Sequence, residues 1–317
     1  MSYIQIKRSS IGKKLVIGFL PLFFLLFASA AQAATLNVPA DHATIQAAIN
    51  ASSSGDTILV APGTYTEGLN LNGKSIQLIG TGGADVTFVD GNNSIGVLLR
   101  ANNGENNSTL VEGFTFQNGN GGVSGVIVNS DLTIRDCVVA NNEASISGFN
   151  QVITSGIAVR GGSPLLERIT IHNNLADARG GFDHTVAPGL YVVGSASPTM
   201  RDSVIRNNIA DGSGFDIQSG VGVMLDSASA SLTLDHVLIH SNEDDVFTAS
   251  DDPDVATVAS GVYLRGGTIN ADYITVAGNT VYTTPPGDVV KAGVIAVSGT
   301  TNLTNSIIAN NGRGLEG

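Results

Sequence analysis

Short segments of alternating apolar and polar residues, each ending in an asparagine, recur along most of the chain. They begin at Arg135 (RDCVVANN), Glu167 (ERITIHNN), Arg201 (RDSVIRNN), Asp235 (DHVLIHSN), Asp272 (DYITVAGN) and Asn305 (NSIIANN). Their last asparagines are 32 to 37 residues apart. A period of two, with many Val and Ile residues between Gly and Asn turns, is typical of strands rather than helical repeats. The pattern predicts a β-solenoid, in which stacked coils bury their inner faces against one another.

Each repeat carries a second strand signal, a glycine followed by alternating apolar residues. These glycines are Gly125, Gly156, Gly189, Gly220, Gly261 and Gly293. In the first strand, the columns that contain Cys137 and Val139 are apolar in most repeats, and residues two apart face the same side of a strand. We expect both columns in the core, with Cys137 as a small core residue rather than a reactive thiol. Cys137 is the only cysteine, so no internal disulfide can form.

Two polar columns have structural explanations. Asparagines stacked about 4.8 Å apart can hydrogen-bond along the stack and satisfy the turn backbone. This ladder comprises Asn142, Asn174, Asn208, Asn242, Asn279 and Asn311. A charged column comprises Glu112, Arg135, Glu167, Arg201, Asp235 and Asp272, with Asp136, Arg168 and Asp202 beside it. We expect charges of alternating sign to form solvated ion pairs, which leaves these arginines without a chemical role.

The first 33 residues have the pattern of an export signal. Four basic residues precede an apolar run from Leu15 to about Phe27, and Ala31-Gln32-Ala33 has the small residues of a cleavage site. We predict a signal peptide over 1–33 and a secreted, periplasmic or cell-surface location in a bacterium. After cleavage, no remaining segment is long and apolar enough to span a membrane. A single mature domain is predicted over 34–317; its last repeat stops without a visible cap, which favours a fragment of a longer protein.

Residues 44–67 (TIQAAINASSSGDTILVAPGTYTE) predict a short helix with Ile45, Ala48 and Ile49 on one face, then a strand over 57–61. Together with GKSIQLIG from Gly73, this segment resembles the amino-terminal cap and first coils of the pectin-lyase-like right-handed parallel β-helix superfamily. It is especially similar to the opening of pectin methylesterases and of uncharacterised secreted β-helix repeat proteins. The resemblance implies an all-β fold: a right-handed parallel β-helix (β-solenoid) with a short N-terminal capping α-helix.

The resemblance brings no complete catalytic set. Pectin methylesterases share the GTYTE element at 63–67 but use motifs resembling QDT, DFIFG and GRPW, and polygalacturonases use NTD and GHG; none of these occurs in the sequence. Polysaccharide lyases and epimerases that act on uronates have looser motifs, so the absence of a motif is weaker evidence against these enzymes. They need a cation to neutralise the uronate and a base to take its C5 proton.

The charge balance argues against nucleic acid as a partner. The chain holds 27 acidic and 15 basic residues, and the predicted signal carries four of the bases and no acid. The mature chain therefore has a net charge of −16, which would repel phosphates.

One column supplies the catalytic candidates. His172, Arg206 and His240 occupy the same position in three successive repeats, one residue before the asparagine-containing turn, so we expect them side by side. An arginine between two imidazoles can bind a carboxylated sugar while a histidine transfers a proton. The alternative is three solvated polar residues on an exposed strand.

The second strand supplies candidates for substrate binding. Its outward column is predicted to hold Tyr191 and Tyr263, with Gly222 leaving a gap between them. Two such rings can stack on sugars, and Arg160 and Arg265, two residues further on, can serve the same surface. Exposed tyrosines without a ligand are the alternative.

The loops between the two strands repeat a Gly-Phe-Asn/Asp motif, and its Phe149, Phe182 and Phe215 are expected to pack into a lateral ridge. The loops are also acidic. Calcium is the one cofactor that they suggest, bound by Asp244, Asp245, Asp251, Asp252 and Asp254. No loop has the spacing of an EF-hand or of a calcium β-roll, so a solvated acidic edge is the favoured alternative.

These observations favour binding without chemistry. We predict an exported repeat protein whose lateral loop face binds an extracellular polysaccharide or another surface partner. One alternative is a polysaccharide lyase or epimerase that uses His172, Arg206 and His240. The other is an adhesin-like structural passenger of a longer surface protein. The oligomeric state is left open.

Overall fold

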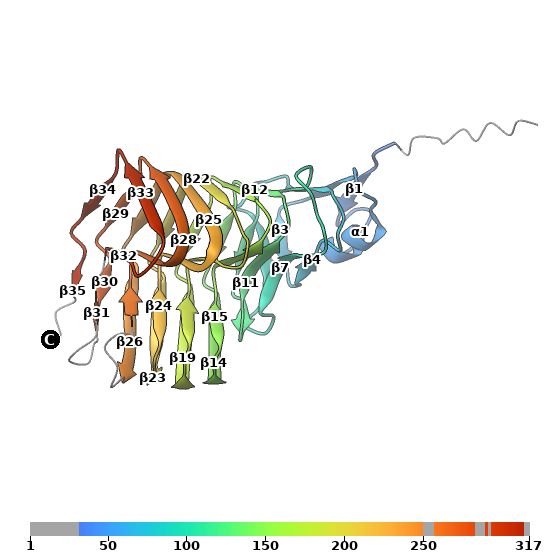
Figure 1. The fold of residues 1–317 in the computed structure, drawn as a ribbon. Coiled ribbons are helices and arrows are strands. Elements are labelled where there is room, and N and C mark those ends of the chain that lie inside the picture. The colour runs from blue at the N-terminus through green and yellow to red at the C-terminus, as the bar shows by residue number, and fades with distance from the viewer. Residues whose placement is uncertain (1–31, 250–256, 283–288, 291–292, 314–317) are drawn as a thin grey trace, which may run out of the picture. The chain divides into compact units, whose positions relative to one another are not determined.

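Parallel strands from successive coils pair along the whole described part of the chain (Figure 1). The computed structural model describes residues 32–249, 257–282, 289–290 and 293–313. In these residues there is one helix, α1 (Ile45–Ala51), and every ladder between named strands is parallel. The chain is therefore all-β with long parallel sheets, consistent with the predicted parallel β-helix.

The coils form a body with three strand-bearing faces. The first face is built from β1 (Thr35–Val38), β2 (Thr57–Val60), β5 (Gln77–Gly80), β8 (Leu110–Glu112), β12 (Thr133–Arg135), β17 (Leu165–Glu167), β22 (Thr199–Arg206), β25 (Val223–His240), β28 (Val262–Asp272) and β33 (Thr300–Thr304). The second continues through β22 and β25 and adds β3 (Gly63–Tyr65), β6 (Thr87–Asp90), β9 (Thr115–Gln117), β13 (Val138–Ala140), β18 (Thr170–His172), β29 (Thr275–Ala277) and β34 (Ile307–Ala309). The third uses the first parts of β25 and β28 and adds β4 (Leu69–Asn70), β7 (Val97–Ala101), β11 (Gly125–Asn129), β16 (Ile157–Gly161), β21 (Leu190–Val192) and β32 (Val294–Ala296).

The segments predicted as loops are strands, and they form a two-layered lateral wing. The outgoing layer contains β10 (Asn120–Gly121), β14 (Glu143–Phe149), β19 (Leu175–Phe182), β23 (Ile209–Phe215), β26 (Glu243–Ala249), β30 (Thr280–Val281) and β35 (Gly312–Arg313). The returning layer contains β15 (Val152–Thr154), β20 (Thr185–Ala187), β24 (Gln218–Gly220), β27 (Thr257–Ala259) and β31 (Val289–Val290). In Figure 1 the wing strands lie in a row beside the body from β14 to β26.

The body core follows the predicted columns. Phe114 and Phe116 are fully buried, with ring centroids 5.9 Å apart. Cys137 is buried in the same core, and burial raises the pKa of its thiol to about 12. A thiol with that pKa is not a nucleophile at neutral pH, so its core assignment is confirmed.

Helix α1 forms where the sequence predicts it. Ile45 and Ile49 are buried, and the Thr44 hydroxyl caps the helix by accepting a hydrogen bond from the Ala47 amide at 3.1 Å. The Glu67 carboxylate accepts two more amide hydrogen bonds at this end, from Ile45 and Gln46. Residues 1–31, which hold most of the predicted signal, lie outside the described residues.

The register corrects one predicted glycine. Leu190 pairs with Val223, and Val223 pairs with Val262, so Gly222 rather than Gly220 precedes the strand in that coil. The strand is therefore two residues out of the predicted alignment. As a result, Met224 lies between Tyr191 and Tyr263, where the sequence predicted a gap.

The asparagine ladder is present. The Nδ2 of each asparagine donates to Oδ1 of the ladder asparagine in the next coil, at 2.9–3.0 Å. The same Oδ1 also accepts a hydrogen bond from the backbone N–H of the donating asparagine. The four asparagines from Asn174 to Asn279 are fully buried. The ladder fixes the corner at which each coil leaves the body and enters the wing.

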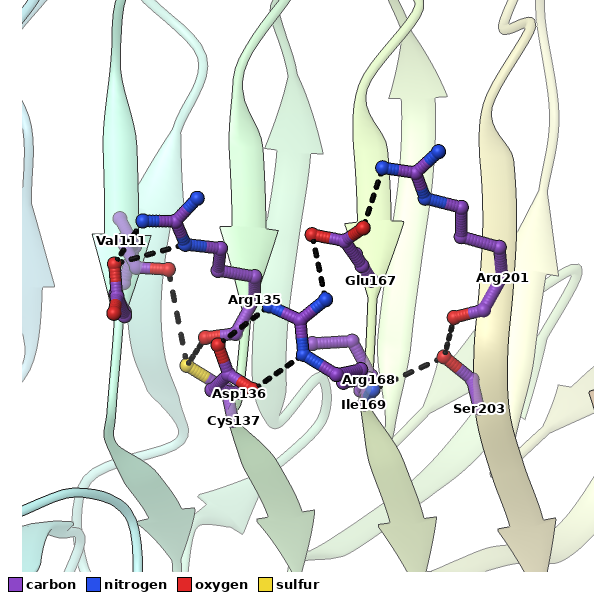
Figure 2. Close-up of polar contacts among 10 residues, drawn as sticks. Val111, Arg135, Asp136, Cys137, Glu167, Arg168, Ile169, Arg201 and Ser203 are labelled. Atoms are coloured by element: carbon purple, nitrogen blue, oxygen red, sulfur yellow. Dashed lines mark hydrogen bonds and ion pairs between the residues drawn. The ribbon is translucent and has the colours of Figure 1, made fainter.

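The charged column forms ion pairs in the first coils (Figure 2). Arg135 binds Glu112 at 2.6 Å, and Arg201 binds Glu167. In the neighbouring column Arg168 bridges Asp136 and Glu167, at 2.7 and 3.0 Å. Each of these arginines binds an acidic residue of an adjacent coil, and Arg168 also binds its sequence neighbour Glu167. The alternating signs of the charged column predicted such pairs.

Candidate functional site

The catalytic candidates lie in a row where the second face of the body meets the wing. His172 pairs in register with Arg206, and Arg206 with His240, at the ends of β18, β22 and β25. All three are partly exposed. The structure thus brings together the three residues that the sequence places in one column.

The local backbone explains why this row faces outward. The next residue in each coil, Asn173, Asn207 or Ser241, has φ between 53° and 55°. Asparagine tolerates this left-handed conformation better than most residues, and the conformation bends the chain at the corner between the body and the wing. The ladder asparagine that follows is buried, so the side chain before the turn stays on the outer surface.

A cavity of about 340 Å³ lies beside the row. We call it the corner groove, and its lining residues are Asn207, Ile209, Ser241, Asn242, Glu243, Gly278, Thr280 and Tyr282. Tyr282 is 38% exposed. Sequence reasoning did not assign Tyr282 or Glu243 to this site. Glu243 follows the ladder residue Asn242 by one position, and Tyr282 follows Asn279 by three. These offsets from the ladder could have placed both residues next to the row.

The electrostatics of the row beside the groove centre on Arg206. Among the described residues its guanidinium has no ion-pair partner. Burial, and then the charge of Arg206, lower the pKa of both His172 and His240, so their imidazoles are neutral at neutral pH. Burial and the nearby Asp245 and Asp211 raise the pKa of Glu243. An unpaired guanidinium between neutral imidazoles can bind a carboxylate or sulfate, and each imidazole can accept a proton or hydrogen-bond a hydroxyl.

The predicted sugar-stacking tyrosines are buried, so this expectation is wrong. Tyr191 and Tyr263 are only 3% and 2% exposed. They pack with Met224, Ala187 and Ala259 in a cluster that also contains Ala158 and Ile295. The outer surface of the third face is covered by the returning layer of the wing, so no ring face there is open to a sugar.

The two arginines of the same proposed surface have different environments. Arg265 forms an ion pair with Asp226 at 3.1 Å and also hydrogen-bonds to Gln218. Asp226 in turn accepts a hydrogen bond from the hydroxyl of buried Tyr191 at 3.1 Å. Arg265 is therefore engaged in a structural network. Arg160 is exposed and has no ion pair within the described part of the chain.

The proposed calcium ligands are not gathered. Asp244 is fully buried inside the wing, whereas the next residue, Asp245, lies on the opposite face of β26. Asp251, Asp252 and Asp254 lie outside the described residues. Within the ranges that the structure describes, no group of three or more His, Cys, Asp or Glu side chains is arranged to hold a metal ion.

The lateral ridge is formed by stacked rings. Phe149 and Phe182 have centroids 5.6 Å apart and an interplanar angle of 5°, and they are 62% and 44% exposed. Phe215 pairs with Phe182 in backbone register.

Comparisons with known proteins give limited matches. No family model matches the chain. Over 127 residues, 38% of this chain, the sequence is 32% identical to a cell surface glycoprotein of Methanothermus fervidus, and the match spans 19% of that relative's length. Among solved structures, an alginate lyase from Paenibacillus sp. str. FPU-7 aligns with 88% of this chain and 97% of its own, at 12% identity and a TM-score of 0.23. That likeness is too low to carry an argument about fold or activity. Among the described residues no helix has the length and apolarity needed to cross a membrane.

Proposed function

We propose that this chain is an exported cell-surface protein that binds extracellular polysaccharide at its lateral face, in the corner groove. The observation that carries the proposal is Arg206, a partly exposed cation in register between two imidazoles, with no carboxylate partner among the described residues. A guanidinium in that setting is matched by a carboxylate or sulfate of a ligand. The export pattern of 1–33 and the name of the cell surface relative support the location.

The right-handed sense of the coils and the capping role of α1 are parts of the same proposal. The helix packs on β1, β2 and β4, and its buried face is Ile45, Ala48 and Ile49. A helix in this place protects the first sheet edge from pairing with other chains.

The test is a binding titration of the purified protein with acidic and neutral polysaccharides. We expect acidic chains to bind, and Arg206→Ala to weaken binding by about tenfold or more, because hydrogen bonds to charged groups contribute about 1.5–3 kcal/mol. Arg100→Ala is the matched control, because Arg100 is partly exposed on β7 and has no ion pair among the described residues. Equal weakening by both variants would show non-specific charge attraction and contradict the proposal.

A second candidate function, a polysaccharide lyase or epimerase, is favoured by the lowered pKa values of His172 and His240. A neutral imidazole is a competent base for the C5 proton of a uronate, and Arg206 would neutralise the carboxylate. A lyase would produce an unsaturated uronate that absorbs in the ultraviolet. Turnover that is unchanged in Arg206→Ala would exclude this site.

The adhesin-like alternative is supported by the length of the relative, of which the match spans 19%. An immunoblot of producing cells tests it. A band much larger than the chain would favour a passenger of a longer surface protein, and a band of the chain's own size would oppose it.

A further inference from the structure

The charged column of the body changes character in its last coils. In the first coils its arginines bind Glu112 and Glu167, but the column ends with two aspartates, Asp235 and Asp272, which pair in register on β25 and β28. Arg201, the neighbour of Asp235 in the column, is bound to Glu167 on its other side. Like charges directly opposite one another destabilise a sheet, so this pair has a folding cost that the earlier pairs lack.

These aspartates border a cavity of about 360 Å³ on the first face of the body. We call it the acidic trough, and its lining residues are Thr233, Leu234, Asp235, Asn270, Ala271, Asp272, Asn302 and Thr304. The outward columns run Thr233–Asn270–Asn302 and Asp235–Asp272–Thr304 across three adjacent strands. The trough lies on a different face from the corner groove.

The hydrogen bonds within the trough leave acceptors available. Thr304 and Asn305 both donate to Oδ1 of Asp272 at 2.8 Å, and these bonds lower the pKa of Asp272 and keep it ionised. Oδ1 of Asp235 contacts Nδ1 of His236 at 2.6 Å. The Asp235–His236 contact is an ion pair when the imidazole is protonated, and the Tyr273 backbone also hydrogen-bonds to the Asp272 carboxylate. Oδ2 of Asp235 has no hydrogen-bond donor in the described part of the chain.

Two stacked rings border the aspartates at the turn. His236 and Tyr273 have centroids 4.8 Å apart and an interplanar angle of 17°, and Tyr273 is 54% exposed. Both have φ near 52°, so the left-handed turn holds the rings beside the aspartate column. An exposed aromatic surface next to carboxylates and amides offers a sugar both an apolar contact and hydrogen-bond partners.

We propose that the acidic trough is a binding site for a glycan that carries primary amino groups. The remaining lone pairs of the two carboxylates accept charge-assisted hydrogen bonds from an ammonium group, and Tyr273 contacts the sugar ring. Asn302 donates from Nδ2 to Oδ1 of Asn270 at 2.8 Å, which leaves Nδ2 of Asn270 and Oδ1 of Asn302 to bind hydroxyls. An acidic sugar is excluded because the same carboxylates repel it. This site does not depend on the proposed function of the corner groove.

The experiment is calorimetric titration of the purified protein with a glucosamine oligosaccharide and with the same oligosaccharide fully N-acetylated. We expect the amino form to bind at least about tenfold more tightly, because acetylation removes the charge that the carboxylates recognise. The double variant Asp235→Asn/Asp272→Asn should lose this preference, and circular dichroism will verify that it is folded.

Two controls decide the outcome. Asp85→Asn removes an exposed carboxylate elsewhere and should leave binding unchanged. Tetralysine carries amines without sugar rings and should bind more weakly than the amino sugar. Equal affinity for both oligosaccharides, equal binding of tetralysine, retained affinity in the double variant, or no binding of the amino form would each overturn the proposal.

Discussion

The body and the wing are built from the same coils but are stabilised differently. The body core consists of large aliphatic and aromatic side chains, closed at one corner by the hydrogen-bonded asparagine ladder. The wing core is small and rich in alanine. Both parts bury polar atoms without a hydrogen-bond partner, such as Oγ1 of Thr87 in the body and Oγ1 of Thr154 in the wing. Only the wing places a carboxyl oxygen, Oδ2 of Asp244, among these atoms in the described part of the chain.

Asp244 shows the difference most clearly. It pairs in register with Ala210 on one side and Val281 on the other, so a carboxyl group occupies a column of apolar residues. Ser219, equally buried, lies in the returning layer beside Val186. Burial raises the pKa of Asp244 to about 7. The comparison teaches that coils with a large apolar core can also carry a lateral extension whose core is small and contains a carboxyl group, and the corner groove lies between the two.

The largest effect is expected in the body, from Asn208→Ala. The change removes the acceptor of two Asn174 donors, its backbone N–H and its Nδ2, and also the donor to the Ile171 carbonyl. Leaving buried donors unsatisfied costs about 1–3 kcal/mol each, so we expect the free energy of unfolding to fall by about 3–5 kcal/mol. Urea denaturation followed by circular dichroism measures this change.

Asn311→Ala is the matched control for that prediction. Asn311 accepts the same two hydrogen bonds, from Asn279, but it is partly exposed at the last rung. Water can replace the lost acceptor there, so we expect a loss of about 1 kcal/mol. Equal losses at Asn208 and Asn311 would show that ladder burial does not account for the stability of the body.

The next effect is a pH dependence that arises in the wing. The unfolded Asp244 carboxyl ionises near pH 3.8 and the folded one near 7, so the folded state holds the proton more tightly. The contribution of Asp244 to stability therefore falls as pH rises through this interval, by at most roughly 4 kcal/mol, and this contribution does not change further above it. Asp244→Asn should remove this decline.

Denaturation near the lower and upper ends of that interval tests the prediction. Glu243 lies on the outer face of β26 and titrates in the same direction, but it is present in both proteins, so the difference between them isolates Asp244. The same pH dependence in the wild type and in Asp244→Asn would show that the buried carboxyl is not its source.

The sequence predicted the body better than the wing for a physical reason. A solenoid core needs period-two strands and turn asparagines at a fixed spacing, and both are visible along the ladder. The row His172–Arg206–His240 was predictable because it keeps a fixed offset from that ladder. Its role in binding or catalysis stays a prediction.

The wing was missed because its strands are weakly apolar, as in the segment EDDVFTA over 243–249. Alternation alone also assigns Tyr191 and Tyr263 to the outside of a coil, and it cannot reveal that a second layer covers them. One signal was available: aligning Ala176, Ala210 and Asp244 at a fixed offset from the ladder places the aspartate in an apolar column.

The smallest effect is expected on the outer surface of the body, from Arg135→Gln. Arg135 donates two hydrogen bonds to Oε2 of Glu112, at 2.6 and 2.8 Å, but its side chain is 38% exposed. Exposed ion pairs contribute about 0–1 kcal/mol, so the unfolding midpoint should move little and should become independent of this pair in high salt. A loss as large as that of Asn208→Ala would mean that the surface charges contribute as much to the stability of the body as the buried ladder does.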